Sequence, residues 1–423
     1  MGTAKANKEP KVFPLDDWYR KYYYDKQKVA KGCMRCSQCK WIDWFEVKQQ
    51  RFSRVCPCNT YYKFDSYSSQ GKMDLSLAIL EGRLDYDSAP GISDVYYKCD
   101  TCGGCDASCK RVNDMEPVRL FLDMRAKLVE DGQMPLEHMM VIEHLQKEDN
   151  MMMASKADRG KWTEGLDVKR VTQTPAKVLF HAGCSSSFDE RMWPLLKDSI
   201  EILKAAKVDV GVLGKDESCC GCRAYDMGFR GEFTKFAQSN IDLWKNAGVE
   251  TVVTACADGY WAFKRLYPEV GSTVQVYHIL EYIEKLIEEG KLKLTKRIPM
   301  HVTYHDPCHL GRRMNIYQPG QAIMGVYETP RNVLKAIPGI ELTEMYRIKE
   351  YAWCCGAGGG VKEAFPDFSE WTARERLLEA AETGAKALVT ACSWCERNFL
   401  DAQSGDGYEM EICDIVNLVQ KAL

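Results

Sequence analysis

The sequence predicts a multidomain protein in which a helical N-terminal part precedes two copies of an α/β unit built on a mainly parallel sheet. Three observations support this fold class. Short apolar β-runs alternate with helical stretches from Lys177 onward, which is typical of parallel sheets covered by helices. Cysteine groups recur in the same order in two segments of that region, and an internal repeat indicates a duplicated unit. The region before the repeat combines cysteine runs with helical patterns such as Met73–Glu81 and Pro117–Glu130.

We expect five segments, because composition and periodicity change at four points. They are an aromatic N-terminal arm (1–30), a helical domain (31–145), a polar connector crossing the surface (146–175), a first α/β domain (176–295) and a second α/β domain (296–423). The repeat is best defined by strands at 178–181, 249–255, 301–305 and 385–391. In such sheets the strand ends open onto the ligand crevice, so the cysteines that follow the strands should converge there.

Composition narrows the class of protein. The 423 residues are 45% hydrophobic and 28% charged, which is ordinary for a soluble globular protein. A net charge of −3 gives no field that would favour nucleic acid or an anionic membrane. The N-terminus has no apolar signal core, and no apolar run reaches the ~18 residues of a membrane helix. We expect a reduced, cytoplasmic protein with no nucleic-acid partner and no direct membrane insertion.

Twenty cysteines are the outlying feature. The helical part contains the run Cys33, Cys36, Cys39, then Cys56-Pro57-Cys58, and then the run Cys99, Cys102, Cys105, Cys109. Runs of this form hold paired cubane 4Fe–4S clusters in which the fourth cysteine of each run binds the other cluster. The spacing therefore predicts a ferredoxin-like domain with one cluster on Cys33, Cys36, Cys39 and Cys109 and another on Cys99, Cys102, Cys105 and Cys56. Zinc is the alternative metal, and Cys58 is the alternative to Cys56.

The second α/β copy carries Cys308, the pair Cys354-Cys355 followed by Gly356, and Cys392-Ser393-Trp394-Cys395. Adjacent cysteines cannot easily bind one tetrahedral ion, which argues against a simple zinc site. Neighbouring thiolates can reach different iron atoms of one cluster, and the following glycines let the backbone come close. We expect an iron–sulfur cluster here, with zinc or free thiols as alternatives.

The first copy offers Cys184, Cys219, Cys220 and Cys256, but Gly259 stands where the second copy has Cys395. Cys222 is an alternative fifth ligand. Three strand-end histidines, His181, His305 and His309, are candidate ligands or proton relays; the alternative is a hydrogen bond to backbone. The glycine run 358–360 lacks the Lys-Ser/Thr of a phosphate loop, so we expect no nucleotide site there.

The double Cys…Cys-Cys-Gly…Cys-x-x-Cys unit resembles the cysteine-rich (CCG) domain of heterodisulfide reductases, and residues 30–423 resemble their fused D-type subunit. The resemblance implies a non-cubane 4Fe–4S cluster that splits a disulfide, held by Cys308, Cys354, Cys355, Cys392 and Cys395. It leaves open whether the first copy holds a second non-cubane cluster, a cubane or none.

The resemblance also implies a role. The chain has no flavin or nicotinamide fingerprint, so electrons must come from a partner. We expect an iron–sulfur electron-transfer subunit, inactive alone, in a soluble anaerobic complex with a flavin-bearing HdrA-like subunit and linked to flavin-based electron bifurcation, as in class II benzoyl-CoA reductase-type complexes. The alternatives are a catalytic disulfide reductase subunit and a quinone-linked subunit of a 2-hydroxy acid or glycerol-3-phosphate oxidising complex. The arm residues Trp18–Tyr24 are a candidate docking surface.

Overall fold

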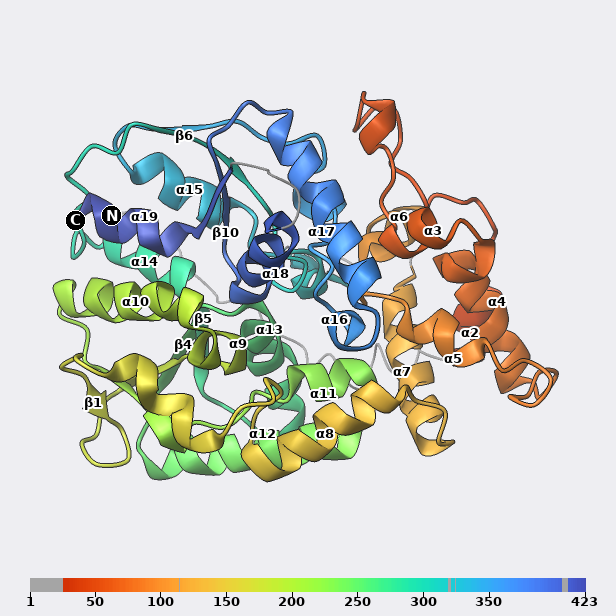
Figure 1. The fold of residues 1–423 in the computed structure, drawn as a ribbon, viewed down its shortest axis with the longest axis horizontal. Coiled ribbons are helices and arrows are strands. Elements are labelled where there is room, and N and C mark those ends of the chain that lie inside the picture. The colour runs from red at the N-terminus through yellow and green to blue at the C-terminus, as the bar shows by residue number, and fades with distance from the viewer. Residues whose placement is uncertain (1–25, 114, 319–320, 324, 405–409) are drawn as a thin grey trace, which may run out of the picture.

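The structure is a computed structural model that describes residues 26–113, 115–318, 321–323, 325–404 and 410–423. The candidate docking segment Trp18–Tyr24 lies outside the described residues. Three bodies are visible: a helical N-terminal domain, a first α/β domain and a second α/β domain stacked on the first (Figure 1). Among the described residues, no helix is both long and apolar enough to cross a bilayer.

The N-terminal domain is helical, as the sequence predicts. Its helices are α2 (Lys26–Lys31), α3 (Pro57–Tyr62), α4 (Ser69–Leu80), α5 (Ile92–Tyr97), α6 (Gly104–Asn113), α7 (Pro117–Glu130) and α8 (Leu136–Glu148). Helix α7 has the expected bounds and starts with Pro117, which needs no N–H partner in the first turn. Helix α4 starts earlier than expected because the Ser68 hydroxyl caps it by accepting from Gly71 N–H. Its buried face includes Lys72 and Ser76, so the simple amphipathic pattern expected for this helix is wrong.

The first α/β domain has a five-stranded parallel sheet in the order β1-β3-β2-β4-β5. Its strands are β1 (Lys169–Arg170), β2 (Val178–His181), β3 (Val210–Val212), β4 (Thr251–Thr254) and β5 (Gln275–His278). Its helices are α9 (Cys184–Phe188), α10 (Trp193–Ala205), α11 (Cys222–Met227), α12 (Arg230–Asn246), α13 (Ala257–Trp261) and α14 (Ile279–Glu288). The central strand β2 is buried at all four positions, as expected for a strand covered on both faces.

The second α/β domain repeats this topology. Its parallel sheet has the order β11-β10-β6-β9, which matches β5-β4-β2-β3 of the first copy. The strands are β6 (Met300–Tyr304), β9 (Ile340–Leu342), β10 (Ala387–Thr390) and β11 (Glu411–Asp414); the helices are α15 (Glu328–Ala336), α16 (Val361–Ala364), α17 (Pro366–Ala381), α18 (Ser393–Gln403) and α19 (Ile415–Ala422). An antiparallel hairpin, β7 (Ile316–Gln318) and β8 (Gln321–Ile323), lies between β6 and α15 of this copy. The two copies pack through α10 against α19 and α14 against α15.

The segment 146–175 differs from the expected surface connector. It contains a 3-10 helix, Lys156–Thr163, and the edge strand β1, which pairs with β3. Met151 and Trp162 are buried in the core of the first sheet. The segment therefore packs with the first α/β domain, which its widely spaced apolar residues did not indicate.

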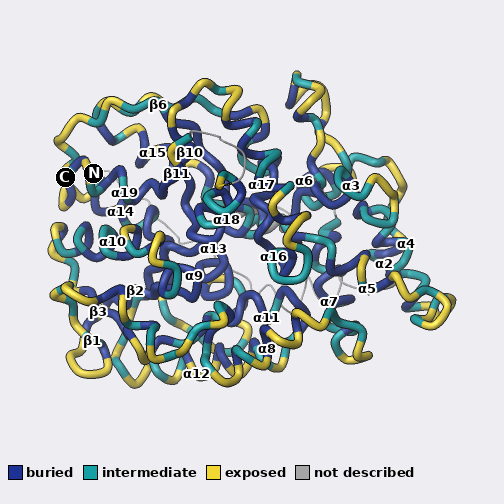
Figure 2. The backbone as a smooth tube through the Cα atoms, in the orientation of Figure 1, coloured by how far each residue is buried: buried dark blue, intermediate teal, exposed yellow. Residues whose placement is uncertain are grey.

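Arg125 joins the three bodies. Its guanidinium is fully buried and donates to Tyr96 O (2.8 Å) and Cys99 O (2.5 Å) in the N-terminal domain. It also donates to Asp226 O (2.8 Å) in the first copy and Gly359 O (2.7 Å) in the second. The meeting region is dark blue in Figure 2, so the cysteine-bearing loops at this junction are shielded from solvent.

Candidate metal centre

The five cysteines of the second copy meet at the end of its sheet. Cys308 follows β6, Cys392 caps α18 from the end of β10, and Cys395 lies in the first turn of α18. The Cys354 thiol is hydrogen-bonded with Cys308 and Cys355, and the Cys395 thiol with Cys355 and Cys392. The structure therefore brings all five into one continuous group.

Hydrogen bonds within this group lower the pKa of some of its thiols and raise that of others. Hydrogen bonding from Cys354, reinforced by His309 and Arg312, holds the pKa of Cys308 well below its usual range. Hydrogen bonds from Cys354 and Cys395 lower the pKa of Cys355 in the same way, and those from Cys256 and Cys395 lower that of Cys392. Hydrogen bonding within the group thus favours thiolate sulfurs, which are the form that binds metal.

Glycines after Cys355 let this segment pack closely against its neighbours. Gly356 has φ +88°, and a Cβ there would come within 2.4 Å of Ser369 O. A Cβ on Gly358 would come within 2.5 Å of Asp100 O in the N-terminal domain. Both positions exclude a side chain, so the glycine run serves close packing and not phosphate binding.

His305 lies against the cysteine group and is held in one tautomer. One of its ring nitrogens lies within 4.8 Å of the sulfurs of Cys355 and Cys395. The Nε of Arg376 donates to Nδ1 of His305 (3.1 Å), and Arg376 is in turn paired with buried Glu379 (2.6 Å). Because a guanidinium cannot accept, Nδ1 must accept, so in the neutral ring the proton is on Nε2 and can be donated to Cys355.

His309 connects the two copies. Its Nε2 lies 3.2 Å from Asp226, and its Nδ1 lies 3.2 Å from Asp258 and 3.3 Å from the Cys308 sulfur. Burial alone would lower the pKa of His309, but the charges of Asp258 and Cys308 outweigh it and raise the pKa well above the usual value. Arg313 pairs with the same Asp226 carboxylate (3.3 Å). For His181 the structure instead gives a hydrogen-bond partner in backbone, Ser218 O (3.2 Å).

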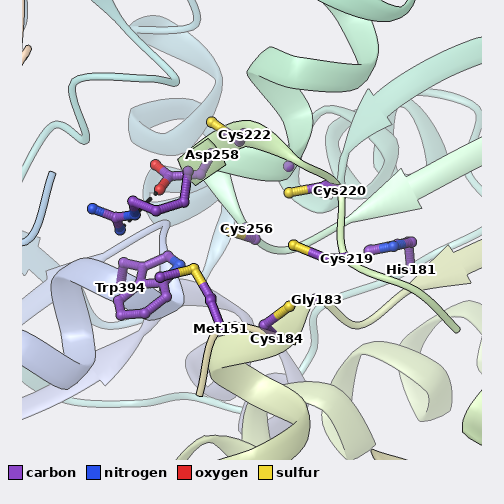
Figure 3. A pocket seen from close by; sticks show the side chains of 12 residues that line it. Met151, His181, Gly183, Cys184, Cys219, Cys220, Cys222, Cys256, Asp258 and Trp394 are labelled. Atoms are coloured by element: carbon purple, nitrogen blue, oxygen red, sulfur yellow. Dashed lines mark hydrogen bonds and ion pairs between the residues drawn. The ribbon is translucent and has the colours of Figure 1, made fainter. Parts of the chain in front are cut away.

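The first copy gathers a smaller group around a cavity. The Cys219 thiol is hydrogen-bonded with Cys184 and Cys220. Arg159, from the segment expected as a connector, donates to Cys184 (3.4 Å) and pairs with Glu217 (3.1 Å). Figure 3 shows these sulfurs around a small cavity of about 20 Å³, with Trp394 of the second copy on the opposite wall.

The first copy has two candidate positions for a fifth ligand, Gly259, which has no thiol, and Cys222. A Cβ on Gly259 would make only ordinary contacts, 3.6 Å to Phe263 and to Thr254. The Cys222 sulfur lines the cavity, yet it also lies within 4.8 Å of ligand atoms of Asp226 and His309. In Figure 3 it stands on the Asp258 side, apart from Cys184 and Cys219.

The two copies touch through their cysteines. The thiols of Cys256 and Cys392 are hydrogen-bonded across the interface. Each follows the equivalent strand of its sheet, β4 or β10, so the duplication itself places them face to face.

In the N-terminal domain, Cys109 lies beside the first cysteine run. Burial raises the pKa of the Cys109 thiol, and the neighbouring Cys39, Cys33 and Cys36 raise it further. The fold therefore brings the fourth cysteine of the second run to the three cysteines of the first, which is the exchange expected for paired clusters. Cys36 is exposed, so this group reaches the surface.

The remaining cysteines of the domain surround a buried lysine that no sequence pattern indicated. Lys72 Nζ lies 3.6 Å from the Cys58 sulfur and donates to Tyr67 O (2.5 Å). Burial alone would lower the pKa of Lys72, but the thiols of Cys58, Cys99 and Cys56 outweigh it and raise the pKa. Cys56 and Cys58 both belong to this group, so both remain candidates for the fourth position.

Cys102 joins the N-terminal domain to the second copy. Its thiol is hydrogen-bonded with Cys354, which lowers the pKa of Cys102 to about 6. Arg312, just after Cys308, donates to Cys102 O (2.5 Å), and Arg313 donates to Thr101 O (2.7 Å). No local sequence signal marks this contact, because it depends on how the two domains pack.

The donor set fits iron–sulfur clusters. The five cysteines of the second copy lie together, four of them are buried, and several of their thiols have lowered pKa values. Sulfur donors from adjacent cysteines suit a multi-iron cluster better than a single tetrahedral ion.

Comparison with known proteins agrees with this donor set. Residues 178–264 and 302–399 both match the family described as "Cysteine-rich domain". The chain is 31% identical over 405 residues to the D-type subunit of the dihydromethanophenazine:CoB--CoM heterodisulfide reductase of Methanosarcina acetivorans, covering 93% of each chain. It is 34% identical over 288 residues to the EtfAB:quinone oxidoreductase of Syntrophomonas wolfei subsp. wolfei, covering 66% of this chain and 38% of that one.

Among solved structures, a hypothetical protein from Helicobacter pylori shares the fold. The TM-score is 0.54 at 13% identity, covering 97% of this chain and 79% of that one. The extent of the sequence match, together with the two cysteine-rich domains, settles the family. The chain belongs to the family of D-type heterodisulfide reductase subunits, and it is an oxidoreductase subunit that works with iron–sulfur clusters and partner subunits.

Proposed function

We propose that the chain is the electron-transfer subunit of an anaerobic redox complex, with two cubane clusters in the N-terminal domain and a special 4Fe–4S cluster in the second copy. Cys33, Cys36, Cys39 and Cys109 would hold one cubane; Cys99, Cys102, Cys105 and Cys56 would hold the other. Cys308, Cys354, Cys355, Cys392 and Cys395 would hold the special cluster. These clusters supply one-electron chemistry when bound.

The observation that carries the proposal is that the cysteine groups lie next to one another across the domain interfaces. Hydrogen bonds join Cys102 to Cys354 and Cys392 to Cys256, and the Cys109 thiol is near enough to Cys36 and Cys105 for their charges to affect its pKa or theirs. A structural role for the cysteines would not require groups that adjoin across both domain interfaces. Burial of the inner members keeps water away, so this chain's own contribution is to hold, insulate and align the redox sites.

Electrons would come from a flavin-bearing HdrA-like partner, in an assembly linked to electron bifurcation. Support comes from the absence of a flavin or nicotinamide fingerprint in the sequence and from a family whose members work in redox complexes. Native anaerobic purification should recover the chain with a flavoprotein. Recovery with a membrane cytochrome would point to the quinone-linked branch instead.

A second function, disulfide reduction by this chain itself, is favoured by one observation. Cys256, which is hydrogen-bonded with Cys392 of the five-cysteine group, lines a small cavity of about 20 Å³. Thiol-dependent dye reduction distinguishes the two functions. The proposal predicts no activity for the isolated chain with small dyes and disulfides, whereas full turnover by the isolated chain would make it a self-sufficient reductase.

A further inference from the structure

The side chain of Lys72 is buried although it ends in an ammonium group. Lys72 lies near the start of α4, is 1% exposed, and shares the buried face of this helix with Met73 and Ser76. Helix α4 belongs to the N-terminal domain (Figure 1). Lysine is almost never fully buried unless its charge is paired, so Lys72 requires an anionic group in the interior of this domain.

No carboxylate in the described part of the chain supplies that partner. Among the described residues, Lys72 Nζ donates to the Tyr67 carbonyl (2.5 Å) and to the Cys58 sulfur (3.6 Å), and it forms no ion pair with an Asp or Glu. The buried Asp100 carboxylate has no hydrogen-bond partner among these residues, so it does not pair with Lys72 either. A carbonyl oxygen carries no net charge, and the counter-charge must therefore come from the sulfur side.

Four cysteine sulfurs lie close enough for their charges to act on Lys72. They are those of Cys58, Cys99, Cys56 and Cys105. A cubane held by thiolates is anionic, and it gains one further negative charge when it is reduced. Such a cluster at these cysteines would supply the charge that the buried ammonium lacks.

A fixed positive charge beside this site favours its reduced state. Charges interact more strongly in a protein interior than in water, and hydrogen bonds to the sulfurs help to set the potential of a cluster. The site also has cysteine groups on both sides: Cys105 is influenced by Cys109, and Cys102 is hydrogen-bonded with Cys354. Anionic clusters at those groups would oppose its reduction, and the ammonium of Lys72 would offset that opposition.

We propose that Lys72 raises the reduction potential of the cubane held by Cys99, Cys102 and Cys105, and so keeps this site reducible between its two anionic neighbours. The inference rests on the proposed function, because it needs a cluster at this site. On reduction the site gains one electron from the neighbouring cubane, which loses it. Lys72 contributes its charge and its N–H···S contact, and no bond to it forms or breaks.

The test is a redox titration at pH 7, followed by EPR, of the full chain purified anaerobically. Lys72→Met keeps the apolar part of the side chain and removes the charge. The cubane signal that Cys105→Ser abolishes should shift to a more negative potential by at least about 59 mV, which is a tenfold loss in the equilibrium constant for one-electron reduction. The signals of the other sites should keep their potentials.

Lys98→Met is the matched control. It also removes an ammonium group, one residue from Cys99. The Lys98 ammonium is already paired with Asp94 (2.5 Å) and lies over the ring of Tyr62 (5.2 Å), so its charge is compensated. The potential of the same cubane should therefore change far less than in Lys72→Met.

A second measurement does not depend on how the Lys72 variant folds. In the unsubstituted chain with ¹⁵N-labelled lysine, pulsed EPR of the reduced cubane should show a weak ¹⁵N coupling, and Lys98→Met should retain it. Absence of this coupling, an unchanged potential in Lys72→Met, or an equal shift in Lys98→Met would overturn the role of Lys72 and leave the cluster in place. Iron analysis that finds no cubane at the Cys99 group would refute the proposed function, and this inference with it.

Discussion

The two α/β copies have the same strand order but different chemistry. The second gathers five cysteines in contact, and Cys102 reaches it from the N-terminal domain. The first gathers four around a small cavity of about 20 Å³, with Gly259 in the fifth position. The residues around the cysteines differ as well. In the second copy Arg376 donates to His305, whereas in the first copy Arg159 donates directly to Cys184. Duplication preserved the scaffold, and a few loop positions and one domain contact made the two sites unequal.

Removing equivalent cysteines from the two copies should have the largest effect and should affect the copies unequally. Cys395→Ser should abolish the spectroscopic signal of the special cluster and release about four irons, because no other thiol in the group can replace it. Cys256→Ser should leave that signal and weaken turnover only partly. Anaerobic EPR and iron analysis measure both. Equal losses from both variants would show that the first copy holds an equivalent site.

Restoring the missing thiol should make metal binding by the first copy more like that of the second. Gly259→Cys fits without strain, because its Cβ would approach other atoms no closer than 3.6 Å. We expect the variant to bind additional iron at the first copy, while Gly259→Ser, which is nearly isosteric with cysteine but has no sulfur, should not. Iron content identical in wild type and Gly259→Cys would indicate that Cys222 or another group already completes the site.

The junction between the copies should contribute to stability through Asp226. Burial would raise its pKa, but Arg313 and His309 outweigh burial and hold the pKa below its usual value. A lowered carboxylate pKa stabilises the fold above the unfolded value of about 3.9 and is lost as the pH falls below it. Asp226→Asn should lower the free energy of unfolding by roughly 3 kcal/mol at pH 7, measured by denaturant titration. A difference that grew on acidification would contradict this origin.

Removing the hydrogen bond from Arg376 to His305 should have the smallest effect on the metal site. Arg376→Met removes the donor that fixes the histidine tautomer, and loss of such outer-shell partners typically weakens metal binding by about 10–100-fold. The measurement is the rate at which a chelator removes iron from the second copy. Arg374→Met, on the same helix but partly exposed, is the control. Identical rates of iron loss in the two variants would show that Arg376 does not support the metal site through His305.

The sequence predicted the elements well where local patterns decide them. Strand β2 and helix α7 have the expected bounds, because a four-residue apolar run and a proline-started amphipathic run are local signals. The cysteine groups followed from the repeat. The contacts of Cys102 with Cys354 and of Cys256 with Cys392 could not be predicted, since they depend on how whole domains pack. The burial of Lys72 was not predicted, because the thiols around it lie far from it in the sequence, and the segment containing Trp162 was taken for a surface connector because its apolar residues are widely spaced.

The central claim is that this chain aligns two cubane clusters with a special cluster in the second copy. Metal analysis and ⁵⁷Fe Mössbauer spectroscopy of the full chain, purified anaerobically, test it most directly. We predict about twelve irons per chain, with about eight in cubane-type spectra and the rest in a distinct site that Cys395→Ser removes. Stoichiometric zinc with fewer than about eight irons, or a single class of iron site, would contradict the claim.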